Sequence, residues 1–226
     1  MRFAFITTDC IDAEGKINLT HYIVGYEELY KFLNLLGTVF GWVSTDVDAK
    51  LNVIRDHRKS ESSENYQDVR SMLKYEVKSH SSYRLPSHAL KKEVFFQVDN
   101  KLIKHKAKDS KTGSRNLLRL HRALEYIVAF LEEVPNLDTN DKCCTISQNA
   151  YKATLQKFHP WVVQKAALLA MNLLPTKAGL IEKICGDDEA KVKRAHEALP
   201  LAVKAMQSVY KKTEEVYLEF ELLNLP

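Results

Sequence analysis

The sequence predicts an all-α fold, and three observations lead to this prediction. Apolar residues recur at the spacing of a helix face along most of the 226-residue chain. The chain has seven glycines and six prolines, and neither residue forms a tract that would mark a linker. Strand signals are weak, because the one candidate, EVFFQV at 93–98, is a short apolar run that is ambiguous. We therefore expect a single domain over residues 1–226 with a substantial core.

The first long helix is expected over residues 26–58. One face of this helix is apolar, because apolar residues follow one another at spacings of four, three and four. The residues of this face are Phe32, Leu36, Val39 and Val43.

Three further helices are expected at 63–77, 114–133 and 145–174. Pro160 falls inside the last of these. Because proline lacks the backbone N–H that a helix interior requires, this helix should kink or restart there. Pro175 then ends it.

The remaining elements follow from helix stop and start signals. Gly186 closes a short helix, since glycine is the usual residue just after a helix. Asp187 or Asp188 can cap the last long helix, which reaches about Leu223. Residues 79–111 have no helical periodicity and are expected to form a long loop.

The positive charge of the chain is concentrated in one segment. The formal net charge is +4, yet residues 101–122 contain eight Lys or Arg and one acid. This segment therefore carries +7 and leaves −3 for the rest of the chain. A basic patch on a mildly acidic body indicates an anionic partner, which could be a phosphate, a membrane surface or a nucleic acid.

The cysteines and the apolar runs indicate a compartment. The four cysteines, at 10, 143, 144 and 185, lack the spacing of metal ligands, so reduced thiols in a cytosolic protein are the simplest interpretation. The N-terminal apolar run is too short for a signal peptide, and no stretch reaches the roughly 18 apolar residues of a membrane span. We expect a soluble, cytosolic chain that needs no metal and no cofactor.

The helix expected at 114–133 carries three arginines on one stripe. Arg115 and Arg119 have no acid three or four positions away, whereas Arg122 has Glu125 at i+3. A solvated basic face would explain this stripe about as well as a binding site. An anion held between two guanidinium groups would convert their repulsion into charge-assisted hydrogen bonds, so the second interpretation is a phosphate site.

Two charged residues continue the apolar face of the first helix. The steps that reach Val43 lead next to Asp46 and then to Lys50, where the pattern calls for core residues. The ordinary interpretation is an i,i+4 ion pair at the rim of this face, which stabilises a helix by about 0.2–0.5 kcal/mol. A functional role for the pair is the alternative.

A histidine stands immediately before the proline that interrupts the fourth helix. His159 can be displayed from a fixed bend at Pro160, although a single histidine is more often a hydrogen-bonded core residue than a ligand contact. Trp161 is either core or an interfacial anchor, since its indole combines an apolar ring with a polar N–H.

Three segments together resemble the signature blocks of the glycolipid transfer protein superfamily. They are GTVFGWVSTDVDAKLNVI (37–54), GSRNLLRLHRALEYI (113–127) and YKATLQKFHPWVVQKAALLAMNLLP (151–175). The resemblance implies a two-layer, all-helical fold with an apolar lipid pocket between the layers. It also implies a carrier that moves single sphingolipids between membranes without chemistry, so no catalytic residue is expected.

The headgroup residues implied by this resemblance indicate a phosphate rather than a sugar. Glycolipid carriers of the superfamily have a tryptophan and an asparagine where this sequence has Arg119 and Lys50, and the ceramide-1-phosphate transfer branch is similar to this sequence. On this resemblance Lys50, Arg115 and Arg119 bind the phosphate. Asp46 accepts the ceramide amide N–H, and His159 donates to the acyl carbonyl. A glycosphingolipid transfer or sensing protein of the same fold is the alternative.

Further expectations concern the membrane and the lipid chains. Trp161 would anchor the protein transiently in a membrane interface, assisted by the lysines before Arg115. The protein is expected to be a monomer. Residues that could line the lipid-chain pocket, and could equally be ordinary core, are Leu36, Val39, Phe40, Val43 and Leu117.

Two other classes of protein fit the sequence less well. An enzyme acting on a phosphorylated substrate would need a nucleophile motif, a glycine-rich phosphate loop or metal-ligand spacing, and the sequence has none of these. A nucleic-acid-binding domain would explain the basic segment but not Asp46 and His159. No nucleic-acid partner is therefore expected.

Overall fold

The structure is a computed structural model that describes residues 10–37, 40–79 and 111–225. Its α-helices are α2 (Leu19–Leu35), α3 (Gly41–Lys59), α4 (Val69–Ser79), α6 (Gly113–Glu133), α7 (Cys144–Ala153), α8 (Trp161–Met171), α9 (Lys177–Cys185) and α10 (Glu189–Glu219). Three short 3-10 helices are η2 (Ser63–Tyr66), η5 (Val134–Asn136) and η6 (Gln156–Phe158). Extended pairing in these ranges is confined to isolated bridges. The all-α prediction is confirmed, while the candidate strand at 93–98 lies outside the described residues, as does most of the expected loop.

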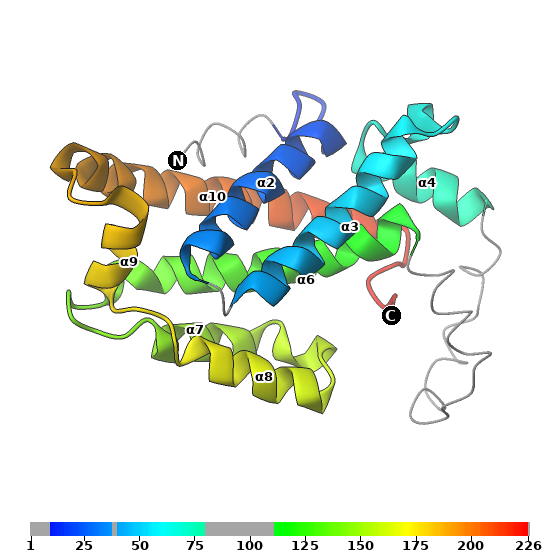
Figure 1. Cartoon of the computed structure of the whole chain (residues 1–226). Coiled ribbons are helices and arrows are strands. Elements are labelled where there is room, and N and C mark those ends of the chain that lie inside the picture. The colour runs from blue at the N-terminus through cyan, green and yellow to red at the C-terminus, as the bar shows by residue number, and fades with distance from the viewer. Residues whose placement is uncertain (1–9, 38–39, 80–110, 226) are drawn as a thin grey trace.

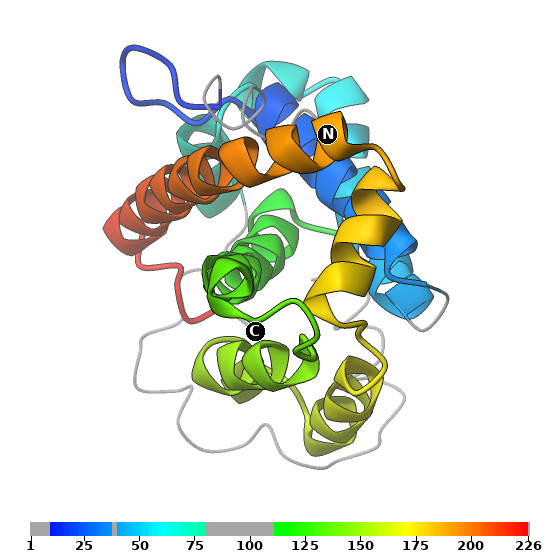
Figure 2. The same cartoon turned by 90° about the vertical axis from the view of Figure 1, so that its left-hand side faces the viewer.

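The helices form two layers with α6 at the centre of the molecule (Figure 1). Seen end-on in Figure 2, α10, α6 and α7 follow one another in one layer, and α2, α3, α9 and α8 lie in the other. α6 packs against α10, α3, α7 and α4. Because α6 has neighbours on several sides, every residue from Gly113 to Leu118 is buried.

The single helix expected at 26–58 is two helices in the structure. Asn18 caps α2, because its side-chain carbonyl accepts from the backbone N–H groups of Thr20 (2.8 Å) and His21 (3.3 Å). Shortly after α2 ends, Gly37 has φ +109°, which residues with a side chain rarely adopt. The prediction of one helix is wrong because the apolar periodicity continues across this break.

Prolines, glycines and aspartates set the later boundaries much as the sequence predicts. Pro160 divides the region expected at 145–174 into α7 and α8, since α8 begins directly after it. Gly186, with φ +62°, ends α9. Asp188 caps α10 by accepting from the backbone N–H of Lys191 at 3.0 Å.

The two other expected helices differ in outcome. The helix expected at 114–133 is α6 to within one residue. The helix expected at 63–77 is instead the 3-10 helix η2 followed by α4, and Asp68 between them accepts from the backbone N–H of Ser71 at 2.9 Å. This local hydrogen bond starts a new helix where periodicity alone predicts continuation.

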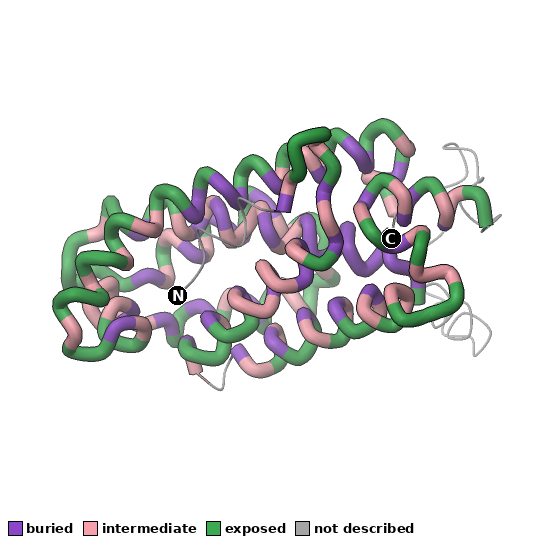
Figure 3. The backbone as a smooth tube through the Cα atoms, turned by 90° about the horizontal axis from the view of Figure 1, so that it is seen from above, coloured by how far each residue is buried: buried purple, intermediate pink, exposed green. Residues whose placement is uncertain are grey.

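The apolar interior consists of two clusters. Figure 3 shows buried positions recurring along the helices between exposed ones. The first cluster joins α2, α3, α4, α6 and α10, and the second joins the end of α2 and the later turns of α6 to α7, α8 and α9. Leu33, Val43 and Leu131 are partly buried and pack against both clusters, so they mark a seam between them. Within the described ranges, no helix is long and apolar enough to cross a bilayer.

Candidate functional site

The charged pair of α3 forms the ion pair that its i,i+4 spacing predicts. Lys50 Nζ contacts Asp46 Oδ1, and it also lies 3.4 Å from the backbone carbonyl oxygen of Asp46. The two side chains differ in exposure, at 13% for Lys50 and 62% for Asp46. The ammonium group therefore lies near the interior, while the carboxylate is open to solvent.

His159 lies in the bend between η6 and α8, where its ring and its backbone are both held. Its ring Nδ1 is 2.8 Å from the hydroxyl oxygen of Tyr151. The side-chain amide of Gln164 donates to the backbone carbonyl of His159 at 2.8 Å. Because Pro160 starts α8 directly after it, the backbone of His159 remains extended. The side chain is thus displayed from a fixed bend, as the sequence predicts.

The electrostatic surroundings of His159 link it to the α3 pair. Burial lowers the pKa of the imidazole, the charge of Asp46 raises it, and the charge of Lys50 lowers it, with a net lowering. The ring is therefore neutral near pH 7. Asp46, Lys50 and His159 come from segments more than one hundred residues apart, and the fold brings these three predicted site residues together.

The two arginines predicted to bind phosphate lie on successive turns at the start of α6. Arg115 is buried, with 7% exposure, and Arg119 is exposed. α6, which carries these two arginines, packs against α3, which carries Lys50. Lys50 and the two arginines therefore lie on two helices that pack together.

The partners that the structure gives Arg122 are not Glu125, the acid that its sequence spacing offers. Its Nη2 donates to the backbone carbonyls of Leu223 (2.9 Å) and Leu225 (3.0 Å), and its Cζ lies 4.0 Å from the centroid of the Phe158 ring. Arg122 therefore has a structural role that differs from the one predicted for Arg115 and Arg119, because it attaches the C-terminal segment to α6.

A buried carboxylate that the sequence analysis missed fixes the start of α6. Glu76, fully buried on α4, accepts from the backbone N–H groups of Gly113 (2.7 Å) and Ser114 (3.0 Å) and from the hydroxyl of Tyr66 (2.9 Å). A carboxylate at this end of a helix is also favoured by the helix dipole. A Cβ at Gly113 would lie 2.6 Å from Met72 Sδ, so this close packing favours glycine. By fixing the first residues of α6, Glu76 also fixes the position of Arg115 and Arg119 on that helix.

Comparison with known proteins identifies the family. Residues 17–186 match the family model described as glycolipid transfer protein (GLTP). Over 222 residues the chain is 33% identical to the ceramide-1-phosphate transfer protein of mouse, which covers 96% of this chain and 91% of that protein. The chain belongs to the glycolipid transfer protein family.

Solved structures agree with this membership of the glycolipid transfer protein family. The mouse ceramide-1-phosphate transfer protein in its apo-form matches with a TM-score of 0.80 and 30% identity, covering 99% of this chain and 98% of that chain. The human protein in complex with 2:0 ceramide-1-phosphate matches with a TM-score of 0.77 and 29% identity, covering 99% and 97%. The two-layer arrangement expected from the resemblance is therefore confirmed.

The residues predicted to line a lipid-chain pocket are divided between the clusters. Leu36 and Phe40 belong to the second cluster, Leu117 belongs to the first, and Val43 lies at the seam. Val39 lies outside the described residues. A role for these residues in holding lipid chains stays a prediction.

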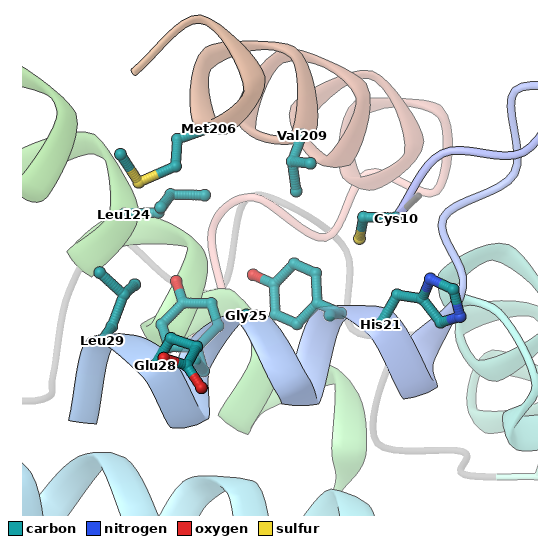
Figure 4. Close-up of a pocket in the computed structure, with 10 residues that line it drawn as sticks. Cys10, His21, Gly25, Glu28, Leu29, Leu124, Met206 and Val209 are labelled. Carbon is teal, nitrogen blue, oxygen red and sulfur yellow. The ribbon is translucent and has the colours of Figure 1, made fainter. Parts of the chain in front are cut away.

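A small pocket lies between α2, α6 and α10 (Figure 4). The four predicted lining residues that the structure describes, Leu36, Phe40, Val43 and Leu117, do not contribute to it. Its volume is about 30 Å³, which is far too small for a lipid chain. Its lining is mostly apolar and consists of Cys10, His21, Tyr22, Gly25, Tyr26, Glu28, Leu29, Leu124, Met206 and Val209.

Trp161 begins α8 on the outside of the fold. Its exposure is 68%, which rules out the core interpretation, and the neighbouring Val162 is 69% exposed. Lys165 Nζ lies 5.8 Å from the centroid of the indole ring. Leu169, two turns further along α8, is 68% exposed. α8 therefore presents large apolar side chains and a positive charge to solvent.

Proposed function

We propose that this chain is a non-enzymatic carrier that binds ceramide-1-phosphate and transfers it between membranes. The observation that carries the proposal is the meeting of Asp46, Lys50 and His159 beside the arginine-bearing helix α6. The names of the relatives support it, since proteins called ceramide-1-phosphate transfer proteins match nearly the whole chain. A glycosphingolipid transfer or sensing protein of the same fold is the alternative.

The phosphate is assigned to three cations. Lys50, Arg115 and Arg119 supply one ammonium and two guanidinium groups, and a lipid phosphate carries up to two negative charges. Guanidinium groups bind phosphate through paired, charge-assisted hydrogen bonds, which compensate the loss of its hydration shell. A sugar headgroup carries no charge and could not form ion pairs with these three cations, which favours the phosphate over the glycolipid alternative.

The ceramide amide is assigned to the acceptor and the donor beside these cations. Asp46 accepts the amide N–H, and His159 donates to the acyl carbonyl. The carboxylate of Asp46 is mostly exposed, so a ligand can reach it from the solvent side. A glycerolipid with ester-linked chains has no amide N–H, so it could not make the hydrogen bond that this assignment gives to Asp46.

The hydrocarbon chains are assigned to the seam between the two core clusters. Val43 lies one turn before Asp46 on α3, and together with Leu33 and Leu131 it is only partly buried. Separating the clusters along this seam would expose apolar surface that begins one turn from Asp46 on α3. Each methylene group that enters is stabilised by roughly 0.8 kcal/mol.

Membrane docking is assigned to the exposed apolar side of α8. Trp161 would insert its indole at the interface, and Lys165 would attract anionic lipid, which contributes about 1 kcal/mol for each such residue near the surface. These contacts are few, so the association is transient and peripheral, as expected for a monomeric cytosolic carrier. Trp161→Ala should weaken sedimentation with anionic vesicles while leaving lipid binding in detergent unchanged.

The test of the proposed function is a vesicle-to-vesicle transfer assay with fluorescent ceramide-1-phosphate and fluorescent glucosylceramide. We expect faster transfer of the phosphate-bearing lipid, and recovery of that lipid chemically unchanged by mass spectrometry. Preferential transfer of glucosylceramide would favour the alternative. A chemically altered lipid would instead indicate an enzyme.

A further inference from the structure

We infer that Tyr151 is a positioning residue whose hydroxyl selects the tautomer of His159 in which Nε2 carries the proton. The Tyr151 hydroxyl oxygen and His159 Nδ1 are 2.8 Å apart, so one of these groups donates to the other. In a neutral imidazole one nitrogen carries a proton and the other accepts, and the partner of one nitrogen decides the role of both. The tautomer is inferred without the proposed function, and only the role of the Nε2–H group in binding lipid rests on that function.

The chemistry of the two groups makes the Tyr151 hydroxyl the donor. Tyr151 is buried on α7, with 1% exposure, and burial raises the pKa of its hydroxyl, so the phenol keeps its proton. The His159 ring is neutral near pH 7 because burial lowers its pKa. A phenol O–H is a stronger acid than a neutral imidazole N–H, and an imidazole nitrogen is a stronger base than a phenol oxygen. The hydroxyl therefore donates to Nδ1.

The packing around Tyr151 holds this geometry in place. Its ring meets the ring of Tyr126 edge-on, with centroids 6.2 Å apart and planes at 89°. On the far side of the histidine, the amide of Gln164 holds the His159 carbonyl. The hydrogen bond joins α7 to the bend before α8, so neither the ring nor the backbone of His159 rotates freely.

The selected tautomer matters because of what lies beside the ring. An amide group presents one donor and one acceptor, so a site that recognises it needs one acceptor and one donor. Asp46 is the acceptor, and an Nε2–H group on His159 is the donor. With the other tautomer both groups would accept, and the acyl carbonyl would meet a lone pair instead of a proton.

The direct test is ¹⁵N NMR of full-length protein labelled at histidine, without lipid, at pH 7.5. The signals of His159 are assigned by their loss in His159→Gln. We expect Nδ1 to have the shift of an unprotonated nitrogen in the wild type, and the two nitrogens of the Tyr151→Phe variant to move toward each other. A protonated Nδ1 in the wild type would overturn the inference, as would identical shifts in the two proteins. The wild-type spectrum alone decides the tautomer, even if the variant folds poorly.

A second arm measures transfer of fluorescent ceramide-1-phosphate. Tyr151→Phe should be about three- to tenfold slower than the wild type, the effect of one misplaced hydrogen bond. The matched control is Tyr30→Phe, which removes the hydroxyl of an exposed tyrosine on α2 and should transfer at the wild-type rate. Unchanged transfer by Tyr151→Phe would overturn the positioning role. A wild type that transfers no ceramide-1-phosphate would overturn the proposed function, while the lipid-free spectra would still decide the tautomer.

Discussion

Lys50 and Asp46 form an ion pair across one turn of α3 in which the cation is mostly buried and the carboxylate is mostly exposed. A ligand with an anionic group and an amide N–H could take the place of each partner. The anion would replace Asp46 at Lys50, and the amide would replace Lys50 at Asp46. The mostly buried ammonium group of Lys50 would keep an anionic partner, and the exposed carboxylate of Asp46 would gain a neutral hydrogen-bond donor, so the exchange avoids the cost of an unpaired buried charge.

Arg119→Leu tests the phosphate assignment. We expect transfer of ceramide-1-phosphate to fall by about tenfold or more, because a hydrogen bond between two charged groups is lost. Arg119 is exposed, so far-ultraviolet circular dichroism should stay unchanged. Arg194→Leu, which removes an exposed arginine from α10, is the matched control. Transfer at the wild-type rate by Arg119→Leu would contradict the assignment.

Asp46→Val tests the amide assignment. We expect the variant to lose its preference for ceramide-1-phosphate over phosphatidic acid, because the preference depends on an acceptor for the amide N–H. The measurement is competition between the two lipids in the transfer assay. Asp56→Val, at an exposed position of the same helix, controls for placing a β-branched residue in α3. A preference that survives in Asp46→Val would count against the contact.

Glu76→Gln tests whether the buried carboxylate fixes the start of α6. The amide would present an NH₂ group to donors that now meet a carboxylate oxygen, so we expect a loss of about 1–3 kcal/mol in the free energy of unfolding. Urea denaturation measures it. Glu197→Gln on the exposed side of α10 should change the free energy very little. Equal stability of the two variants would show that the cap contributes nothing.

Glu214 predicts a stability change at acidic pH. A hydrogen bond from His121 lowers the pKa of Glu214, and Arg122 and Lys157 contribute to the lowering. The contribution of a depressed carboxyl is present above its unfolded pKa of about 4.5 and is lost as pH falls through the folded pKa. The urea midpoint of the wild type should therefore fall more steeply below pH 4.5 than that of Glu214→Gln. Parallel curves between pH 3 and 6 would contradict this.

Local sequence signals predicted much of the fold. α6 was predictable because its apolar stripe is unbroken. The boundaries at Pro160 and Gly186 were predictable because proline begins a helix and glycine ends one. The break between α2 and α3 was missed, since Gly37 was the one signal against a continuing apolar face. Glu76 had a signal of its own, because it continues the buried stripe of α4 from Met72.

The contacts of the candidate site were less predictable than its members. A pattern along one chain identifies Asp46, Lys50 and His159 as residues out of place, but it does not show which groups meet across helices. The hydroxyl of Tyr151 reaches His159 only because η6 turns the chain back toward α7. The partners of Arg122 lie about one hundred residues away, where spacing on a helix carries no information.

Native mass spectrometry tests the central claim most directly. The full-length protein would be incubated with an equimolar mixture of ceramide-1-phosphate, glucosylceramide and phosphatidic acid. We expect one lipid for each protein chain, with the mass of ceramide-1-phosphate. A complex with glucosylceramide, or binding of phosphatidic acid to the same extent, would contradict a site built to hold both a phosphate and an amide.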